Sequence, residues 1–586
     1  MHKSAPLLVT CLFGLSLAGC ASITGSGDTS AADEKIDTNQ QEGIGQTSSE
    51  PPIEYADFEP EILYLLLSAE IAAQRGRYDV TLVNYLRAAQ QSRDKNVIER
   101  AMRIAQSLNG DNAQKQLAEL WLDVDPRNLH ALQVSAIQAV KRNELESALG
   151  YMERILNQGG DADFDSLAAM AGNLPPEQQQ ELLALYEEMA SRHPDTPELE
   201  YSIALLLKIT GNPDAALRRL EPLLAEEPNF QPAIILKGDL LYQTGNVIEA
   251  LDHLLVNTRR FPANRQMGTL YGRMLISEGE LQAAQDEFGR LSDRYPRNPG
   301  LRLSHALVAL ENGQLELAKE ELTRLTEQGH QASEANYYLG RIEDEAGNAE
   351  QAIGYYQNVE QGNYYLPALS RASALMAAEG RLEEALDNIR SLRSANPQRA
   401  ENYWLLEVNL LLDQGLQQEA LEAGSSALEE YPENLQIRYA RAMLFDALDQ
   451  PDKAEEDLKQ IVANNPENAV ALNALGYILT TRTDRLKEAR GYIEQALALD
   501  PENPAILDSM GWVLFQEGQI EPALNYLSRA WAAFPDPEVA AHYGEALWMS
   551  GAEEQAQIVW KEGLEQEPDH VVLRETIERL TNNGDL

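Results

Sequence analysis

Residues Ser333 to Tyr364 read SEANYYLGRIEDEAGNAEQAIGYYQNVEQGNY, and this stretch decides the fold. Gly340 is a small residue within one apolar helical segment, and Ala352 is a small residue within the next. Between them stands Gly347, where a helix can stop and the chain can turn back through a left-handed conformation. The stretch therefore predicts two antiparallel helices that pack closely through small side chains.

The same pattern returns along the chain in steps of 33 to 35 residues, with one double step of 68. A helix pair repeated at this period predicts a stacked array, in which each pair buries its apolar face against its neighbours. We therefore expect function to lie on a long surface and not in a catalytic pocket. The alanines that mark the repeats are Ala148, Ala216, Ala250, Ala284, Ala318, Ala352, Ala385, Ala420, Ala454, Ala489, Ala523 and Ala556.

Glycines and prolines stand at fixed places relative to these alanines. Glycines five residues before an alanine are expected at the turn between helices, and those seven residues earlier at the close helix contact. Prolines twelve residues after an alanine predict the end of the second helix, because proline cannot continue a helix but suits the start of the next. The turn glycines are Gly211, Gly245, Gly279, Gly313, Gly347, Gly415 and Gly518, and the contact glycines are Gly238, Gly272, Gly340, Gly511 and Gly544.

These residues resemble the tetratricopeptide repeat (TPR) family, over roughly residues 60 to 568. The resemblance implies an all-α solenoid, a right-handed superhelix of stacked antiparallel helix pairs. Tyr364 departs from the family pattern, which usually closes the repeat with proline. We expect a TPR array over 195–568, a capping helix and tail over 569–586, and degenerate helical repeats over 58–194. Those degenerate repeats are either a specialised end cap or drifted repeats.

The N-terminus has the pattern of a secretory signal. Lys3 precedes an apolar run from Ala5 to Leu17, which is too short to span a bilayer. The following Leu17-Ala18-Gly19-Cys20 resembles the lipobox of bacterial lipoproteins. That resemblance implies a lipoprotein signal peptide over 1–19, cleavage before Cys20, diacylglycerol on the Cys20 thiol and an acyl chain on the new amino terminus, with palmitate among the fatty acids. The alternative is an ordinary cleaved signal.

The residues around Cys20 extend this expectation. Ala21 follows it, in place of the aspartate associated with inner-membrane retention, so the resemblance implies a lipid anchor in the outer membrane, on its periplasmic face. Residues 20–57 are predicted to be the lipidated cysteine and a flexible tether, because the polar composition from Ala21 onward cannot bury enough apolar surface to fold. The second of the 2 Cys, Cys11, lies in the signal, so the mature chain would have no free thiol.

Acidic residues outnumber basic residues 93 to 47, which gives a formal net charge of −46. Such a surface repels phosphate backbones, so nucleic acid is excluded as a partner, whereas basic proteins would be steered toward it. The alternative is that the acidity only maintains solubility.

The sequence contains no motif of an enzyme, and we expect no cofactor, no metal site and no small-molecule substrate. The chain has no phosphate-binding loop and no GxGxxG, HExxH or GxSxG motif. Asp161, Asp163 and Asp165 imitate the start of a calcium loop, but Ser166 and Gly172 stand where its glycine and glutamate should be. We therefore expect no enzyme.

In TPR proteins the first helix of each pair lines a concave groove. This resemblance places a set of aromatic residues and Met on that wall, where they are expected to bind a protein partner. The alternative is that some of these rings only pack against the neighbouring repeat. Asn409 has Leu405 before it in place of the lysine of the family's carboxylate clamp, so capture of an acidic C-terminal peptide is not expected. The predicted partner-binding residues are Tyr439, Met443, Tyr477, Trp512, Phe515 and Trp548.

The C-terminal repeats carry a narrower resemblance, to long proteobacterial repeat lipoproteins. It rests on Asn473 to Tyr477, Arg482 to Arg485, Leu507 to Trp512 and Pro535 to His542. With the lipobox, it suggests the lipoprotein binding partner of a periplasmic carboxyl-terminal processing protease. Such a protein would be a non-catalytic adaptor that holds the protease and presents substrates such as cell-wall hydrolases. The alternative is a scaffold for an envelope machine, such as pilus or exopolysaccharide export.

Overall fold

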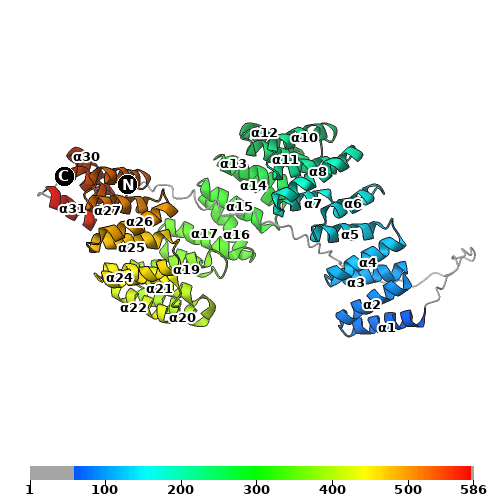
Figure 1. Ribbon diagram of the computed structural model, residues 1–586, viewed down its shortest axis with the longest axis horizontal. Helices are drawn as coiled ribbons and strands as arrows, with labels where there is room; N and C mark the ends of the chain where they lie inside the picture. Colours follow the sequence, from blue (N-terminus) through cyan, green and yellow to red (C-terminus); the bar gives the residue numbers. More distant parts are fainter. Residues whose placement is uncertain (1–58, 582–586) are drawn as a thin grey trace, which may run out of the picture. The chain divides into compact units, whose positions relative to one another are not determined.

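The computed structural model describes residues 59–581, which form helices throughout and contain no strand. This part of the chain confirms the prediction of an all-α solenoid built from antiparallel helix pairs (Figure 1). The predicted signal peptide 1–19, Cys20 with the tether 20–57, and the end of the tail after Thr581 lie outside the described residues.

The described residues divide into two compact units, 59–131 and 132–581. The division falls inside α5 and not at 194/195, where the sequence repeats become regular; that boundary stays a prediction. The helices of the first unit are α1 (Pro60–Gln74), α2 (Tyr78–Ser92), α3 (Lys95–Ser107) and α4 (Asp111–Val124), followed by α5 (Leu129–Lys141) across the division.

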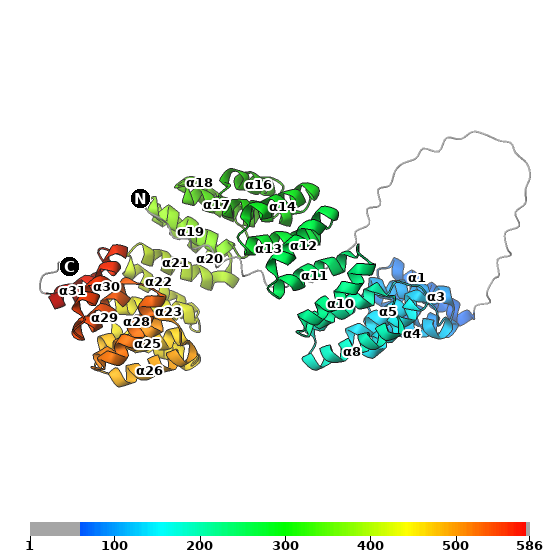
Figure 2. The ribbon, with the colours of Figure 1, turned by 90° about the horizontal axis from the view of Figure 1, so that it is seen from above.

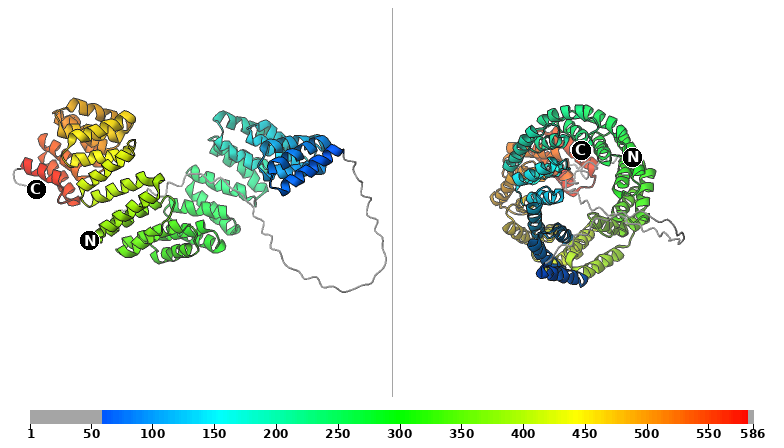
Figure 3. Two further views of the ribbon diagram at one scale, coloured as in Figure 1. Left: turned by 90° about the horizontal axis from the view of Figure 1, so that it is seen from below. Right: turned by 90° about the vertical axis from the view of Figure 1, so that its right-hand side faces the viewer.

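In the second unit, from α8 onward, each helix packs on the next along the chain, so neighbours in sequence are neighbours in space (Figures 2 and 3). Its first part holds α6 (Leu145–Leu156), α7 (Phe164–Met170), the 3₁₀ turn η2 (Ala171–Asn173), α8 (Pro176–Arg192), α9 (Pro197–Ile209), α10 (Pro213–Glu226), α11 (Gln231–Gln243), α12 (Val247–Arg260), α13 (Arg265–Ser277), α14 (Leu281–Arg294), α15 (Pro299–Glu311), α16 (Leu315–Glu327), α17 (Ala332–Glu345) and α18 (Ala349–Gln357).

The remaining helices continue the same stack to its C-terminal end, where the predicted capping helix α31 packs on α29 and α30. They are α19 (Tyr365–Ala378), α20 (Leu382–Ala395), the 3₁₀ turn η3 (Pro397–Arg399), α21 (Ala400–Asp413), α22 (Gln417–Glu430), α23 (Leu435–Ala447), α24 (Pro451–Asn464), α25 (Ala469–Arg482), α26 (Leu486–Leu499), α27 (Pro504–Gln516), α28 (Ile520–Ala533), α29 (Pro537–Met549), α30 (Glu553–Gln566) and α31 (Val571–Thr581).

The marker alanines form the buried seam of the stack. All twelve have 0% of their surface exposed. The contact glycines lie opposite a large side chain of the second helix, four residues after the marker alanine. A Cβ atom on Gly340 would stand 2.7 Å from Tyr356, and one on Gly511 would stand 2.5 Å from Leu527. The predicted close approach is therefore confirmed, and the large residue that fills each glycine's space is identified.

The turn glycines hold the predicted left-handed conformation. Their φ angles lie between 71° and 82°. Asn143 and Asp449 stand at the same place in repeats that lack this glycine, and they also have positive φ, of 61° and 56°. Asparagine and aspartate tolerate this conformation better than other side chains, so the turn survives without glycine.

The second helices end where the prolines predict, two residues before Pro194, Pro228, Pro262, Pro296, Pro397, Pro432, Pro466, Pro501, Pro535 and Pro568. The second helices α6, α16 and α18 end without such a proline, and α18 is the shortest of them: it ends at Gln357 after nine residues, whereas α20 has fourteen. Here Tyr364 replaces the proline. Its ring stacks on Tyr337 with centroids 4.6 Å apart, and its hydroxyl lies 3.0 Å from that of Tyr338. These contacts close the repeat in place of the missing helical turn.

Within residues 59–581, the helices are all too short or too polar for a bilayer crossing.

Candidate protein-interaction surface

The candidate interaction surface lies on three first helices, α25, α27 and α29. Each packs on the next, one repeat further along the chain. The hydroxyl of Tyr477 on α25 donates a hydrogen bond to Oε1 of Glu538 on α29, 61 residues away and two repeats further on. Helices two repeats apart come this close only on the inner side of a curved stack. This contact therefore places the three helices on a concave face.

The protonated state of Tyr477 supports this hydrogen bond. Burial, followed by the negative charge of Glu538, raises the pKa of the Tyr477 hydroxyl well above its usual value. The hydroxyl therefore keeps its proton at physiological pH and donates a hydrogen bond to the carboxylate.

A buried ion pair joins the two C-terminal helices of this face. Nδ1 of His542 on α29 lies 2.9 Å from Oδ2 and 3.1 Å from Oδ1 of Asp508 on α27. Burial by itself lowers the pKa of His542, but the Asp508 carboxylate, with Glu538 and Glu545, outweighs burial and raises it above the usual value. The raised pKa favours the protonated, positively charged form of the imidazole ring.

Trp512 completes this buried cluster. Its ring stacks on the His542 ring with centroids 4.1 Å apart, and on the Phe515 ring with centroids 5.2 Å apart. An aromatic face attracts a positively charged imidazole, so the stack supports the same charged state of His542. Only 9% of the surface of Trp512 is exposed. Packing therefore buries most of Trp512, and its role in partner binding stays a prediction.

The other predicted partner-binding residues are half-buried on first helices. Tyr439, Met443 and Phe515 pack against the apolar core between α23 and α28. Trp548 stacks on Trp560 of its own repeat with centroids 5.5 Å apart. Each has a packing contact and a partly exposed surface. Their role in partner binding stays a prediction.

A hollow of about 220 Å³ opens on this face. Its walls come from the three first helices and from the turn before α29. Phe534 stands at its edge with 58% of its surface exposed. Sequence reasoning did not single out Phe534, Asp508, Glu538 or His542 as site residues; the available signal was the repeat spacing, because residues 34 apart share a register. The lining residues are Asn473, Tyr477, Pro504, Ala505, Asp508, Ser509, Phe534, Asp536, Glu538 and Val539.

Other buried acids of the array are paired with arginine or lysine. Arg438 and Arg441 lie 3.1 Å and 2.7 Å from Oδ1 of Asp457. Arg579 of α31 makes two hydrogen bonds, of 2.8 Å and 2.6 Å, to Glu545. Burial of a charge is costly unless it is paired, so these pairs serve the stacking of the helices. The acids around the hollow differ, because Glu538 and Asp536 form no ion pair with any residue of 59–581.

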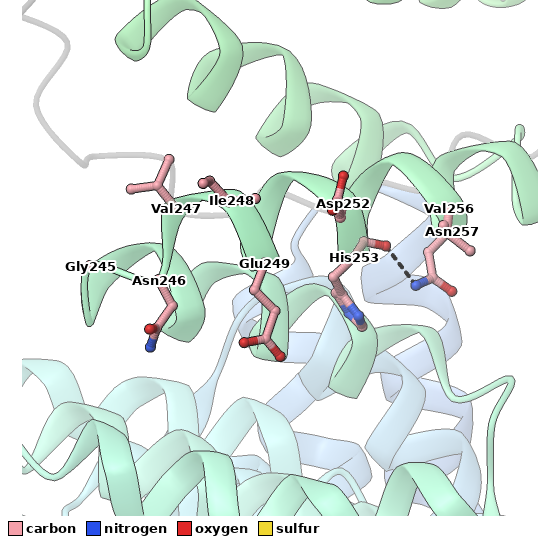
Figure 4. Close-up of a pocket in the computed structure, with 9 residues that line it drawn as sticks. All are labelled: Gly245, Asn246, Val247, Ile248, Glu249, Asp252, His253, Val256 and Asn257. Atoms are coloured by element: carbon pink, nitrogen blue, oxygen red, sulfur yellow. Dashed lines mark hydrogen bonds between the residues drawn. The ribbon is translucent and has the colours of Figure 1, made fainter.

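A second, more open depression lies along α12 and is lined only by residues 245–257. Figure 4 shows Glu249 and His253 pointing to one side of the helix and Ile248 and Asp252 to the other. His253 Nε2 lies 3.0 Å from the carbonyl oxygen of Ile234, and burial lowers its pKa. Ile248 is 80% exposed. Since α12 and the turn before it supply the whole lining, this depression does not bring together functional side chains from different helices.

The acidic motif near residue 163 has a structural role. Asp163 accepts a hydrogen bond from the backbone N–H of Ser166, at 3.3 Å, and so caps the N-terminus of α7. Among residues 59–581, His, Cys, Asp and Glu side chains form no group of three or more arranged to hold a metal ion.

Known proteins resemble this chain at the level of sequence. A family model described as "Tetratricopeptide repeat" matches residues 482–541, and a second with the same description matches 303–364 and 439–504. The "TPR repeat-containing protein PA4667" of Pseudomonas aeruginosa is 39% identical over 584 residues, which cover 99% of this chain and 97% of that protein.

Solved TPR structures also match, with low overall superposition. A tetratricopeptide repeat protein of Parabacteroides merdae is 18% identical, with a TM-score of 0.35, over 43% of this chain and all of that one. TTC0263, a TPR protein of Thermus thermophilus, is 22% identical, with a TM-score of 0.29, over 31% of this chain and 99% of that one. The family of this chain is therefore established by its sequence relative and not by these structures.

Proposed function

This chain belongs to the tetratricopeptide repeat family, as its relative in Pseudomonas aeruginosa does, and on that premise we propose that it is a scaffold that holds protein partners along its concave face. Proteins of this family are generally non-catalytic scaffolds, and TPR repeats imply protein partners. The observation that carries the proposal is the Tyr477–Glu538 contact, because it places α25, α27 and α29 on the inner side of the stack.

The finer part of the proposal is an adaptor role at the outer membrane. Cys20 would carry the lipid anchor, and the array would hold a periplasmic carboxyl-terminal processing protease while presenting cell-wall hydrolases to it. Two features support this. The stretches that resemble repeat lipoproteins, Leu507 to Trp512 and Pro535 to His542, fall on the concave helices α27 and α29. The net charge of −46 suits basic substrates.

Tethering is the mechanism by which such an adaptor would act. When one solenoid holds both the protease and its substrate, each meets the other at a raised effective concentration. The scaffold then accelerates proteolysis without any catalytic group of its own. This mechanism predicts that the chain alone has no hydrolytic activity.

The first experiment is affinity purification of the full chain from gently solubilised membranes, followed by mass spectrometry. A protease of the predicted class supports the adaptor. Components of a pilus or an exopolysaccharide exporter would replace the adaptor with the envelope-machine scaffold. Recovery of no protein partner would refute both.

The second experiment tests the concave face in a reconstituted degradation assay with the recovered protease and substrate. Tyr439→Ala combined with Met443→Ala truncates two half-buried residues of the first helix α23. The control combines Ile248→Ala with Val256→Ala, which truncates two exposed residues of the second helix α12. Loss of stimulation in the α23 variant alone supports the proposal, provided circular dichroism shows unchanged helicity. Equal stimulation by both variants would exclude these two residues from partner binding.

A further inference from the structure

The hollow between α25, α27 and α29 has chemistry that the array itself does not use. Glu538 receives one hydrogen bond, from Tyr477, at Oε1. Asp536 receives one, from the backbone N–H of Glu538 at 2.9 Å, at Oδ1. The second oxygen of each carboxylate has no hydrogen-bond donor from residues 59–581. The hollow thus presents hydrogen-bond acceptors to whatever enters it.

Asn473 provides an independent sign of a missing donor. Its Oδ1 atom is buried and accepts no hydrogen bond, and Asn473 lines the same hollow. A buried amide oxygen without a partner is destabilising, because it has lost its hydrogen bond to water, so such atoms are rare in folded proteins. A ligand that donates to this oxygen would recover that loss.

The charges that line the hollow indicate that its ligand is positively charged. Asp508, the most deeply buried acid of the hollow, already has a partner in His542, whose Nδ1 lies 2.9 Å from its Oδ2. Glu538 and Asp536 are half-buried and have no cation within ion-pair distance among residues 59–581. Two partly desolvated negative charges therefore remain to be compensated.

The walls define the shape of the ligand. The volume, about 220 Å³, suits one long side chain and excludes a folded element. Phe534, Pro504 and Val539 provide an apolar wall beside the acceptors. A guanidinium matches this arrangement, because its planar fork donates several hydrogen bonds while the methylene stem lies along apolar surface.

We propose that this hollow binds one arginine side chain of an extended segment of a partner protein that lies along the first helices. The proposal rests on the scaffold function and adds the chemistry by which a partner is recognised. The guanidinium pairs with Glu538 and donates to Asn473 Oδ1, and its stem packs on Phe534. The bound segment crosses successive first helices, so the residues on either side of its arginine contact the adjacent repeats.

The test uses two fluorescein-labelled peptides of Gly, Ser and Leu, one with a single central arginine and one with citrulline at that place. Citrulline keeps the shape of arginine but has no charge. Fluorescence anisotropy measures their affinities for the purified full chain. We expect the arginine peptide to bind about tenfold more tightly, because the charge-assisted pair with Glu538 is lost with citrulline.

Two variants with the same change of charge locate the site. Glu538→Gln is expected to abolish the preference for arginine. Glu521→Gln is the control, because Glu521 lies exposed in the first turn of α28, just as Glu538 lies in the first turn of α29. Asn473→Arg, which supplies the hollow with a guanidinium of the chain's own, is expected to abolish the preference as well.

Three results would overturn the proposal: equal affinity of the two peptides, an equal loss in both glutamate variants, or an undiminished preference in Asn473→Arg. Urea unfolding midpoints show whether a variant has merely lost its fold. Because Glu538→Gln and Asn473→Arg change the hollow in different ways, one can still test the proposal if the other fails to fold. The peptides need no protease, so this experiment can fail while the adaptor stands, and it can succeed when no protease is recovered.

Discussion

Gly476 on α25 faces Ile493 on α26 so closely that a Cβ atom on Gly476 would stand 2.4 Å from Cγ1 of Ile493. The same Cβ would stand 2.8 Å from the carbonyl oxygen of Ala489, one of the marker alanines. The backbone oxygen cannot rotate away as a flexible side chain could. The close approach of the two helices in this repeat therefore depends on the missing side chain.

Gly476→Ala should destabilise the array by about 1–3 kcal/mol through overpacking. Gly491→Ala on the facing helix α26 is the matched control, because a Cβ there would have no neighbour within 4 Å. That change should stabilise the helix by about 0.5–1 kcal/mol. Urea unfolding followed by circular dichroism measures both. Equal effects of the two substitutions would contradict the assigned contact.

Ala284→Leu should cost about 1–3 kcal/mol, because Ala284 is fully buried at the seam of α13 and α14. Since each repeat depends on its flanking repeats, the damage should extend beyond the substituted pair. Ala532→Leu, at an exposed position near the end of α28, should change stability by no more than about 0.5 kcal/mol. The urea unfolding midpoints of the two variants measure both effects. An unchanged midpoint for Ala284→Leu would mean that the assigned repeat register is wrong.

The Asp508–His542 pair should make stability depend on pH. The pKa of His542 is raised in the folded state, so the folded chain holds this proton more tightly than the unfolded chain does. The contribution is fully present below the unfolded pKa, about 6.5, and is lost as pH rises through the raised value. The urea midpoint should therefore fall as pH increases from about 6 upward.

His542→Gln should flatten this pH dependence, and His330→Gln should leave it unchanged, because His330 is exposed and lies outside the cluster. Trp512 fluorescence offers a second readout, since its ring stacks directly on His542. If the wild-type midpoint is constant between pH 6 and the raised pKa, the pair does not stabilise the fold in this way.

Cys20→Ser should prevent acylation and release the protein from membranes while the repeats stay folded, because Cys20 is the only thiol predicted to remain after signal cleavage. Labelled palmitate followed by immunoprecipitation measures the lipid, and fractionation measures the location. Equal labelling of wild type and variant would contradict the lipobox interpretation.

The repeat unit could be predicted from sequence because each of its signals is local. The turn at Gly347, the seam at Ala352 and the helix end before Pro228 each depend on the steric needs of a few residues within one helix pair. Where the local signal changes, the structure changes with it: Tyr364 replaces a proline, and α18 ends after nine residues.

The candidate site could be predicted only in part. Counting within the repeat correctly placed Tyr477 and Trp512 on first helices, but it could not tell that Trp512 is buried against His542. It also left Phe534 unnoticed, because that residue lies in a turn outside the counted helical positions and becomes a wall only when α29 packs beside α27.

By itself, then, the sequence determined the helix pairs, their turns, their ends and the buried seam, since these follow from the backbone preferences and side-chain sizes of adjacent residues. Only the tertiary structure decided that Tyr477 reaches Glu538 across two repeats and that Asp508 pairs with His542. The physical reason is curvature: the small rotation between successive repeats accumulates along the stack, and it brings together side chains that no single repeat contains.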